Sequence, residues 1–476
     1  MNQTNSRTGS GLDADLTVDR PLAGGSGPAH QRLAAWLRSE INGGRLLPGD
    51  RLPPSRALAE QLGASRWVVT EAYDQLKAEG YLTGRTGSAT IVAEVAPRPP
   101  ATPDTPPATP TDPAAVLDLS PALPDLGSFP RSWWRAAITR ALVTASDVQL
   151  GHPDPAGEPE LRRVLADYLR RVRALDGRPD HVQITQGVGN AVWLLCRHLR
   201  ARGVRRLAVE NPCWPRVRRI AGVHDLDVVP VPVDGEGLIV DHLVAADAQQ
   251  RIDAVVTMPT HQFPTGVPLS PPRRLALLSW AETGNRWIVE DDYDSEFRYD
   301  RRPVGALAAL APERVIYLGS VSKTLSPSLH LGWMVVPEPL RAGLDAARDA
   351  LGALAPALDQ LALADLIDSG RYDRHLRRMR RLYQARRLAL LAALAAESVP
   401  GAAAPSMDAG LHVLWYLPAA TDESRLIERS RGAGIALTGL APCHTGRGRP
   451  GLVLGYGNLP EHRAAGVARL LAAAAR

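Results

Sequence analysis

The pattern of apolar and polar positions predicts a small helical unit near the N-terminus. Residues 30–42 place apolar side chains on one helical face before a pair of glycines, and residues 55–62 carry an apolar i,i+4 pair. Ser65 is the expected N-cap of a third helix that ends before Gly80. Residues 81–94 follow as two short strands around a glycine-containing turn. Three helices and a hairpin, with a short turn between helices two and three, predict a winged helix-turn-helix.

The rest of the chain has a different pattern, in which strand-like apolar runs alternate with helical segments. The clearest runs are RLAVE, DAVVTMP, RWIVEDD and RVIYLGS. This alternation predicts an α/β domain with a mostly parallel sheet. Eight prolines between Pro97 and Pro113 precede it and favour an extended spacer. We therefore expect a disordered lead-in over 1–27, a winged helix over 28–95, a Pro-rich linker over 96–117 and the α/β domain over 118–476.

Composition excludes several classes of protein and draws attention to one residue. The net charge of +5 is mild, and three cysteines without a CxxC motif argue against a disulfide framework and a structural zinc site. No metal site is predicted, and the absence of a long apolar run favours a cytoplasmic protein without a membrane segment. Among 55 Lys and Arg residues, only Lys77 and Lys323 are lysines. Because arginine replaces lysine in charge but not in imine formation, Lys323 is a candidate for covalent chemistry.

The third helix of the predicted winged helix offers a DNA-binding surface. Its N-terminal end would enter the major groove, where Arg66 is able to donate two hydrogen bonds to guanine. Ser65, Thr70 and Arg56 would reach phosphates, and residues 85–88 would form the wing against the neighbouring backbone. The alternative interpretation is a three-helix packing module whose arginines are only solvated.

Lys323 follows an apolar strand inside a serine-rich turn, and the groups that pyridoxal phosphate requires have candidates elsewhere in the domain. Asp291 is the candidate acid for the pyridine nitrogen, and Tyr293 is the candidate hydroxyl for the phenolic oxygen. The phosphate has candidate ligands in the backbone of Val188 and Gly189 and in the Ser320 hydroxyl. Trp214 offers a flat stacking surface for the ring. Each also has an ordinary interpretation. SVSK matches the S-x-x-K of penicillin-binding enzymes, but the chain has no K-T-G to complete that pattern. EDDYDSE suits a solvated loop, TQGVGN suits a plain strand-to-helix turn, and a tryptophan suits the core.

The segment GRLLPGDRLPPSRALAEQLGASRWVVTEAYDQLKAEGYLTGRTGSAT resembles the DNA-binding domain of GntR-type bacterial regulators. In that family the DNA-contacting positions match Arg56, Ser65, Arg66, Trp67, Thr70 and the wing, including Arg85 and Gly87. The motifs GHPDPAGEPELR, THQFPTG, EDDYDSEF and GSVSKTLSPSLHLGW resemble fold-type I aminotransferases, most closely the aminotransferase-like domain of the MocR subfamily of GntR regulators. The resemblance implies pyridoxal phosphate as cofactor, with Lys323 forming the internal aldimine, Asp291 pairing with the pyridine nitrogen and Tyr293 binding O3′. It also implies a homodimer in a head-to-tail arrangement.

Two positions depart from the family pattern. His330 stands where the family has an arginine that grips the cofactor phosphate, and Val453 stands where it has an arginine that binds the carboxylate of amino-acid ligands. Arg216 matches a second ligand-binding arginine, and Arg447 and Arg449 are near enough in sequence to Val453 to substitute for the missing one.

The sequence therefore predicts a DNA-binding transcriptional regulator, not an enzyme, that holds pyridoxal phosphate on Lys323 and senses a small effector related to amines or amino acids. Two alternatives stay open. One is a regulator whose large domain has lost the cofactor and binds another ligand, and the other is an active aminotransferase fused to a DNA-binding domain.

Overall fold

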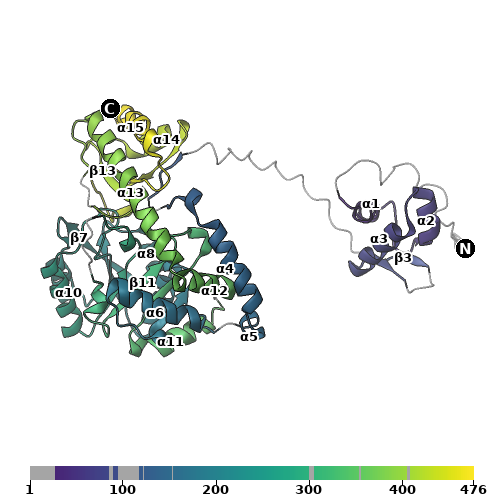
Figure 1. The fold of residues 1–476 in the computed structure, drawn as a ribbon, viewed down its shortest axis with the longest axis horizontal. Helices are drawn as coiled ribbons and strands as arrows, with labels where there is room; N and C mark the ends of the chain where they lie inside the picture. Colours follow the sequence, from purple (N-terminus) through teal and green to yellow (C-terminus); the bar gives the residue numbers. More distant parts are fainter. Residues whose placement is uncertain are drawn as a thin grey trace, which may run out of the picture. The chain divides into compact units, whose positions relative to one another are not determined.

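The computed structural model describes residues 27–84, 89–94, 117–121, 123–152, 154–299, 305–352, 355–404 and 408–475. The chain divides into two compact units, Met1–Pro110 and Thr111–Arg476 (Figure 1). Residues 1–26 of the expected lead-in and 96–116 of the expected linker lie outside the described residues.

The N-terminal unit is a three-helix core with a small sheet. Its helices are α1 (Ala29–Asn42), α2 (Ser55–Leu62) and α3 (Arg66–Ala78), and its strands are β1 (Arg51–Leu52), β2 (Leu82–Thr83) and β3 (Thr90–Val92). The apolar stripes of the three helices meet in one cluster, in which Leu33, Leu58 and Val69 are fully buried. The sheet has the order β1-β3-β2, so the expected hairpin gains a third strand that the sequence pattern did not indicate.

An eight-stranded sheet forms the centre of the large unit, with the order β5-β12-β11-β10-β9-β6-β7-β8. Its strands are β5 (Val182–Thr185), β6 (Arg206–Asn211), β7 (Asp227–Asp234), β8 (Gly237–Leu238), β9 (Ala254–Thr257), β10 (Trp287–Asp291), β11 (Val315–Ser320) and β12 (Gly332–Val335). The pairs β11-β10, β10-β9, β9-β6 and β6-β7 are parallel, whereas β12 runs antiparallel to both of its neighbours. The expectation of a mostly parallel α/β sheet is confirmed.

Helices cover both faces of this sheet, which explains the continuous apolar runs. Successive residues of one strand enter opposite cores: Val255 packs in one cluster and Val256 in the other. One face is covered by α7 (Val188–Ala201), α8 (Pro215–Val223) and α11 (Glu338–Asp349). The larger cluster on the other face includes residues of α6 (Pro159–Arg173), α9 (Val240–Gln249), α10 (Pro271–Thr283) and α12 (Ala357–Asp368).

The remaining elements complete the large unit. They are β4 (Leu117–Asp118), α4 (Arg131–Thr144), α5 (Asp147–Leu150), α13 (Arg371–Glu397), β13 (His412–Tyr416), α14 (Glu423–Gly432), β14 (Ile435–Ala436), β15 (Thr438–Gly439), β16 (Gly451–Gly455) and α15 (Ala464–Ala475). The C-terminal strands form a small antiparallel sheet of order β13-β16-β15, and β14 pairs with β4. Figure 1 shows α14, α15 and β13 gathered at one end of this unit.

Candidate functional site

A cavity of about 760 Å³ lies in the large unit, where several strands of the main sheet end. Asp291 is the last residue of β10 and Ser320 the last of β11, and the β5–α7 connection lies at the same edge. In open α/β sheets this edge is the usual place for a ligand. The cavity brings together all nine residues that the sequence indicated for cofactor and effector: Val188, Gly189, Trp214, Arg216, Asp291, Tyr293, Ser320, Lys323 and His330.

Lys323 lies in the turn after β11 and lines this cavity. Burial lowers the pKa of its ammonium group, while the negative charges of Asp294 and Asp291 act in the opposite direction. A lower pKa leaves more of the neutral amine, which is the nucleophilic form of a lysine.

Asp291 is buried, and its Oδ1 has no hydrogen-bond partner among the described residues. Burial raises the pKa of this carboxyl group to about 7, with a further rise caused by Asp292, while Lys323 opposes both effects. A buried carboxylate oxygen without a donor is costly unless a ligand supplies one. A protonated pyridine nitrogen is such a donor, so Asp291 fits the ring end of pyridoxal phosphate.

The hydroxyl of Tyr293 belongs to a buried polar chain beside the cavity. It lies 3.0 Å from Nδ1 of His261, and the same nitrogen lies 2.9 Å from Oδ2 of Asp294. Burial raises the pKa of Tyr293 well above its ordinary value, so the phenol stays protonated. These contacts orient the Tyr293 side chain at the cavity wall and leave it able to exchange hydrogen bonds with a ligand oxygen.

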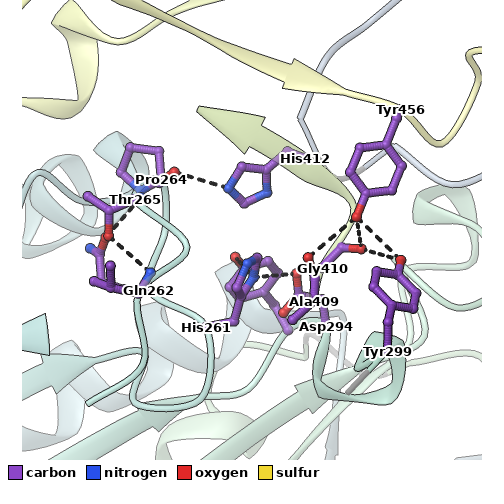
Figure 2. A network of polar contacts seen from close by, with 12 residues as sticks. His261, Gln262, Pro264, Thr265, Asp294, Tyr299, Ala409, Gly410, His412 and Tyr456 are labelled. Carbon is purple, nitrogen blue, oxygen red and sulfur yellow. Dashed lines mark hydrogen bonds and ion pairs between the residues drawn. The ribbon is translucent and has the colours of Figure 1, made fainter. Parts of the chain in front are cut away.

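A second histidine packs on this chain (Figure 2). The ring centroids of His261 and His412 are 5.2 Å apart, and His412 Nε2 donates to the carbonyl of Pro264 at 3.2 Å. Burial lowers the pKa of His412 to about 3, which keeps the ring neutral. Gly410 is required here, because its φ is +79° and a Cβ would lie 2.1 Å from Cε1 of His261.

His261, Asp294 and His412 are also of the residue types that bind metal ions, with one ligand atom each within 4.8 Å of the others. The 2.9 Å contact between His261 Nδ1 and Asp294 accounts for that pair without an ion, and His412 reaches the group by packing its ring on His261. None of the three was singled out from the sequence, although His261 lies in THQFPTG and Asp294 in EDDYDSEF.

Glu210 was also missed from the sequence and holds the loop that carries His261. Its carboxylate accepts hydrogen bonds from the Thr257 hydroxyl at 2.6 Å, from the Met258 amide at 3.2 Å and from the Gln262 side chain at 3.1 Å. Burial raises the pKa of Glu210 to about 7, while these hydrogen bonds oppose the rise. The signal in the sequence was an acid at the end of an apolar strand, which a solvated turn would explain equally well.

The connection from β5 to α7 lines another part of the cavity with a turn whose geometry suits an anion. Gly187 has a φ of 80°, and the backbone N–H groups of the first turn of α7 lack acceptors within the helix. Strand β12 passes close beneath, since a Cβ on Gly332 would lie 2.8 Å from Cα of Gly187. Ser320 is buried at the end of β11, and Trp214 lies at the start of α8 as its N-cap.

In the N-terminal unit, α3 presents its N-terminal end to solvent. Ser65 is the N-cap predicted from the sequence, and its side chain accepts a hydrogen bond from the amide of Val68. Arg66 and Thr70 are exposed, and Trp67 keeps 62% of its surface accessible. Arg56 on α2 is exposed as well, 3.5 Å from Glu60. Arg85 and Gly87 lie outside the described residues.

Comparisons with known proteins agree with both units. Residues 29–92 match the model for bacterial regulatory proteins of the gntR family, and residues 119–449 match the model for aminotransferase class I and II. The chain is 34% identical over 432 residues to the pyridoxine biosynthesis transcriptional regulator PdxR of Corynebacterium glutamicum, covering 90% of this chain and 92% of that one. It is 32% identical over 457 residues to the probable rhizopine catabolism regulatory protein MocR of Rhizobium meliloti, covering 91% and 90%.

The chain belongs to the MocR subfamily of GntR-type transcriptional regulators.

The large unit of this MocR-type regulator has the fold of an aminotransferase. It superposes on the kynurenine aminotransferase of Pyrococcus horikoshii with a TM-score of 0.69 and 25% identity, over 76% of this chain and 90% of that one. The predicted combination of a winged helix with a fold-type I domain is therefore confirmed, as is a DNA-binding transcriptional regulator. Within the described residues, no helix has the length and apolarity needed to cross a membrane.

The structure places the two positions at which the resemblance led us to expect arginines, His330 and Val453. His330 lies exposed at the cavity wall, with a left-handed φ of 49°. Val453 on β16 is fully buried in an apolar cluster. Arg449 does not substitute for the missing arginine, because its guanidinium bonds the carbonyl of Gly401 at 2.7 Å and does not line the cavity. Arg447 is exposed and does not line it either.

Proposed function

We propose that this MocR-type regulator holds pyridoxal phosphate in the cavity at Lys323 and that a small effector related to amines or amino acids binds beside the cofactor. The observation that carries the proposal is the buried, unpartnered Oδ1 of Asp291 in the same cavity as a lysine of lowered pKa. When bound, pyridoxal phosphate supplies an aldehyde that reacts reversibly with primary amines.

Each side chain has a distinct part in this arrangement. Lys323 would be the covalent anchor, Asp291 would accept a hydrogen bond from the protonated pyridine nitrogen, and Tyr293 would donate to the phenolic oxygen. The Ser320 hydroxyl and the backbone N–H groups of Val188 and Gly189 would hold the phosphate of the cofactor. His330 at the cavity wall would add a further donor, and Trp214 would offer a stacking surface.

The N-terminal unit reads DNA through α3. Arg66 contacts base edges, Trp67 contacts a sugar or a thymine methyl group, and the residues that approach the backbone are Arg56, Ser65, Thr70 and, on the wing, Arg85 and Gly87. An effector changes transcription only if it binds more tightly to one arrangement of the regulator than to another. The difference between these two binding free energies is the most by which the effector can change the affinity for DNA.

The functional form is a homodimer, in a head-to-tail arrangement of two chains. Exposed apolar side chains on α4 and α5 support this part of the proposal: Leu142, Val143, Val148 and Leu150 are all more than half accessible, with Val143 at 80%. Such a concentration on neighbouring helices is typical of a protein interface. Light scattering of the full chain should give twice the mass of 51.1 kDa.

The test of the cofactor site uses the two lysines of the chain. Full-length protein is incubated with pyridoxal phosphate, reduced with borohydride, digested and analysed by mass spectrometry. We expect the reduced adduct on the peptide that contains Lys323 in the wild type and in Lys77→Arg, and no adduct in that peptide in Lys323→Arg. A wild type without the adduct would favour a regulator that has lost the cofactor. Sustained transfer of amino groups from amino acids to a keto acid would favour the aminotransferase, whose fold this domain shares.

A further inference from the structure

The cavity changes in chemistry from one end to the other. The end formed by the β5–α7 turn and Ser320 offers backbone N–H groups and hydroxyls. Trp193, Trp214 and Ile220 line the cavity from α7 and α8, the helices that also carry Gly189 and Arg216. A separate apolar wall is formed by Met258, Phe263 and Cys443. The first end suits an anion, whereas a charged group against the apolar wall would lose its hydration without gaining a partner there.

The apolar wall continues into a second layer of side chains. Met258, Phe263 and Cys443 pack in a cluster with Leu414, Leu440 and Val453, and the last three are exposed by 2%, 0% and 0%. Val453 pairs across the small sheet with Leu414 on one side and with Thr438 on the other. Among the described residues that line the cavity beside this cluster, Met258, Phe263 and Cys443 carry no charge, so a carboxylate pressed against them would lose hydration without gaining a charged partner from them.

Arg216 is the one arginine among the described residues that line the cavity, and it lies at the polar end. A Cβ on Gly189 would lie 3.1 Å from its Cζ and 3.3 Å from its Nη2, so the guanidinium covers the first turn of α7. Its Cζ is 5.9 Å from the ring centroid of Trp214. Arg218 on the same helix is unavailable to a ligand, because it bonds the carbonyls of Pro442 at 2.5 Å and Cys443 at 2.7 Å.

We infer that Arg216, which the family resemblance assigned to an effector, binds the phosphate group of the cofactor instead, and that the apolar wall takes an amine with an apolar substituent and no carboxylate. This inference rests on the proposed function. A guanidinium beside free N–H groups suits a phosphate dianion, to which arginine donates two parallel hydrogen bonds. With Arg216 engaged there, the described lining leaves no arginine for an effector carboxylate, while the apolar wall gains free energy from burying a hydrocarbon group.

The first experiment separates the phosphate from the rest of the cofactor. Pyridoxal phosphate and pyridoxal, which lacks the phosphate, are titrated into full-length wild type, Arg216→Gln and Arg219→Gln, and binding is followed by absorbance and tryptophan fluorescence. Arg219 is an exposed residue of the same helix that does not line the cavity, so it is the matched control. We expect Arg216→Gln to weaken the binding of pyridoxal phosphate at least about tenfold and to leave the affinity for pyridoxal unchanged. Arg219→Gln should change neither affinity. If Arg216→Gln lowers the affinity for both ligands equally, or lowers neither affinity, the assignment of Arg216 to the phosphate is overturned.

The second experiment compares two ligands that differ by a carboxylate. Phenethylamine and L-phenylalanine are titrated by calorimetry into full-length protein loaded with pyridoxal phosphate. We expect phenethylamine to bind at least about tenfold more tightly, because the carboxylate of phenylalanine finds no partner. Equal or tighter binding of phenylalanine would overturn the inference, and loss of that binding in Arg216→Gln would place the guanidinium at a carboxylate instead.

Failure of the proposed function gives a different result. If the wild type takes up neither pyridoxal phosphate nor pyridoxal and forms no covalent adduct on Lys323, the cofactor site itself is absent. If the adduct forms but the two titrations contradict our expectations, the cofactor site at Lys323 is supported. In that case only the assignment of Arg216 to the phosphate and of the apolar wall to the amine is wrong.

Discussion

Replacing Asp291 with asparagine should stabilise the cofactor-free protein at alkaline pH while weakening its hold on pyridoxal phosphate. Burial raises the pKa of Asp291 from its ordinary 3.8 to about 7. At about 1.4 kcal/mol for each factor of ten in proton affinity, ionising this group in the folded protein costs about 4 kcal/mol. The asparagine side chain has nearly the same shape as aspartate and carries no charge, so this cost disappears in Asp291→Asn.

The pH dependence follows from linkage. Because the folded-state pKa lies above that of the unfolded chain, Asp291 contributes its full stability below about pH 4 and loses it as the pH rises to about 7. The stability of Asp291→Asn relative to the wild type should therefore increase by about 3 kcal/mol between pH 5 and pH 8. Any unmet hydrogen bonds of the amide are the same at both pH values and cancel in this difference.

The assay is urea denaturation of the cofactor-free full-length protein at pH 5 and pH 8, followed by tryptophan fluorescence. Asp292→Asn is the matched control, because Asp292 is equally buried but pairs with Arg173 at 2.7 Å and accepts from Tyr317 at 2.6 Å. Its loss should destabilise by about 3–5 kcal/mol at pH 5 and by less at pH 8, because removing the Asp292 charge also eases the ionisation of Asp291. Asp292→Asn should stay less stable than the wild type at pH 8, whereas Asp291→Asn should be more stable. Loss of one charge-assisted hydrogen bond should also weaken pyridoxal phosphate binding by Asp291→Asn about 10–100-fold. If Asp291→Asn behaves like Asp292→Asn, or if its relative stability does not change with pH, the assignment of Asp291 as an unpartnered ligand-binding acid is refuted.

Three further changes test other parts of the molecule. Arg66→Ala should weaken binding to an operator fragment by about 1–3 kcal/mol and relax its base preference in a mobility-shift assay; unchanged specificity would contradict the placement of α3 in the major groove. Ser65→Ala removes the side-chain cap of α3 and should cost about 1 kcal/mol in thermal denaturation of the N-terminal unit, without altering pyridoxal phosphate binding. Gly332→Ala places a Cβ 2.8 Å from Cα of Gly187 and should cost about 1–3 kcal/mol, whereas Gly466→Ala, with no atom within 4 Å of the added carbon, should not destabilise. Equal effects of the two glycine changes would contradict the close passage of β12 beneath α7.

The sequence predicted most of the elements because their signals are local. The strands of the central sheet appear as continuous apolar runs, since they are buried on both faces, and the cap at Ser65 depends only on the residues that follow it. Strands of two residues such as β1 and β15 were not predicted, because they are too short to show a period. They form through pairing with strands that lie elsewhere in the chain.

The sequence by itself also determined which reactive groups the large domain contains. They include a single lysine, an acid at the end of one strand and glycines at the start of one helix. Only the tertiary structure decided how these groups are placed. It buried Asp291 with an oxygen unpartnered, surrounded Val453 with apolar side chains and laid Arg216 over Gly189. It also joined Tyr293, His261 and Asp294 into one chain of contacts. The reason is physical: periodicity reports which face of an element is apolar, whereas pKa values and hydrogen-bond partners depend on which distant segments fill the space around a group.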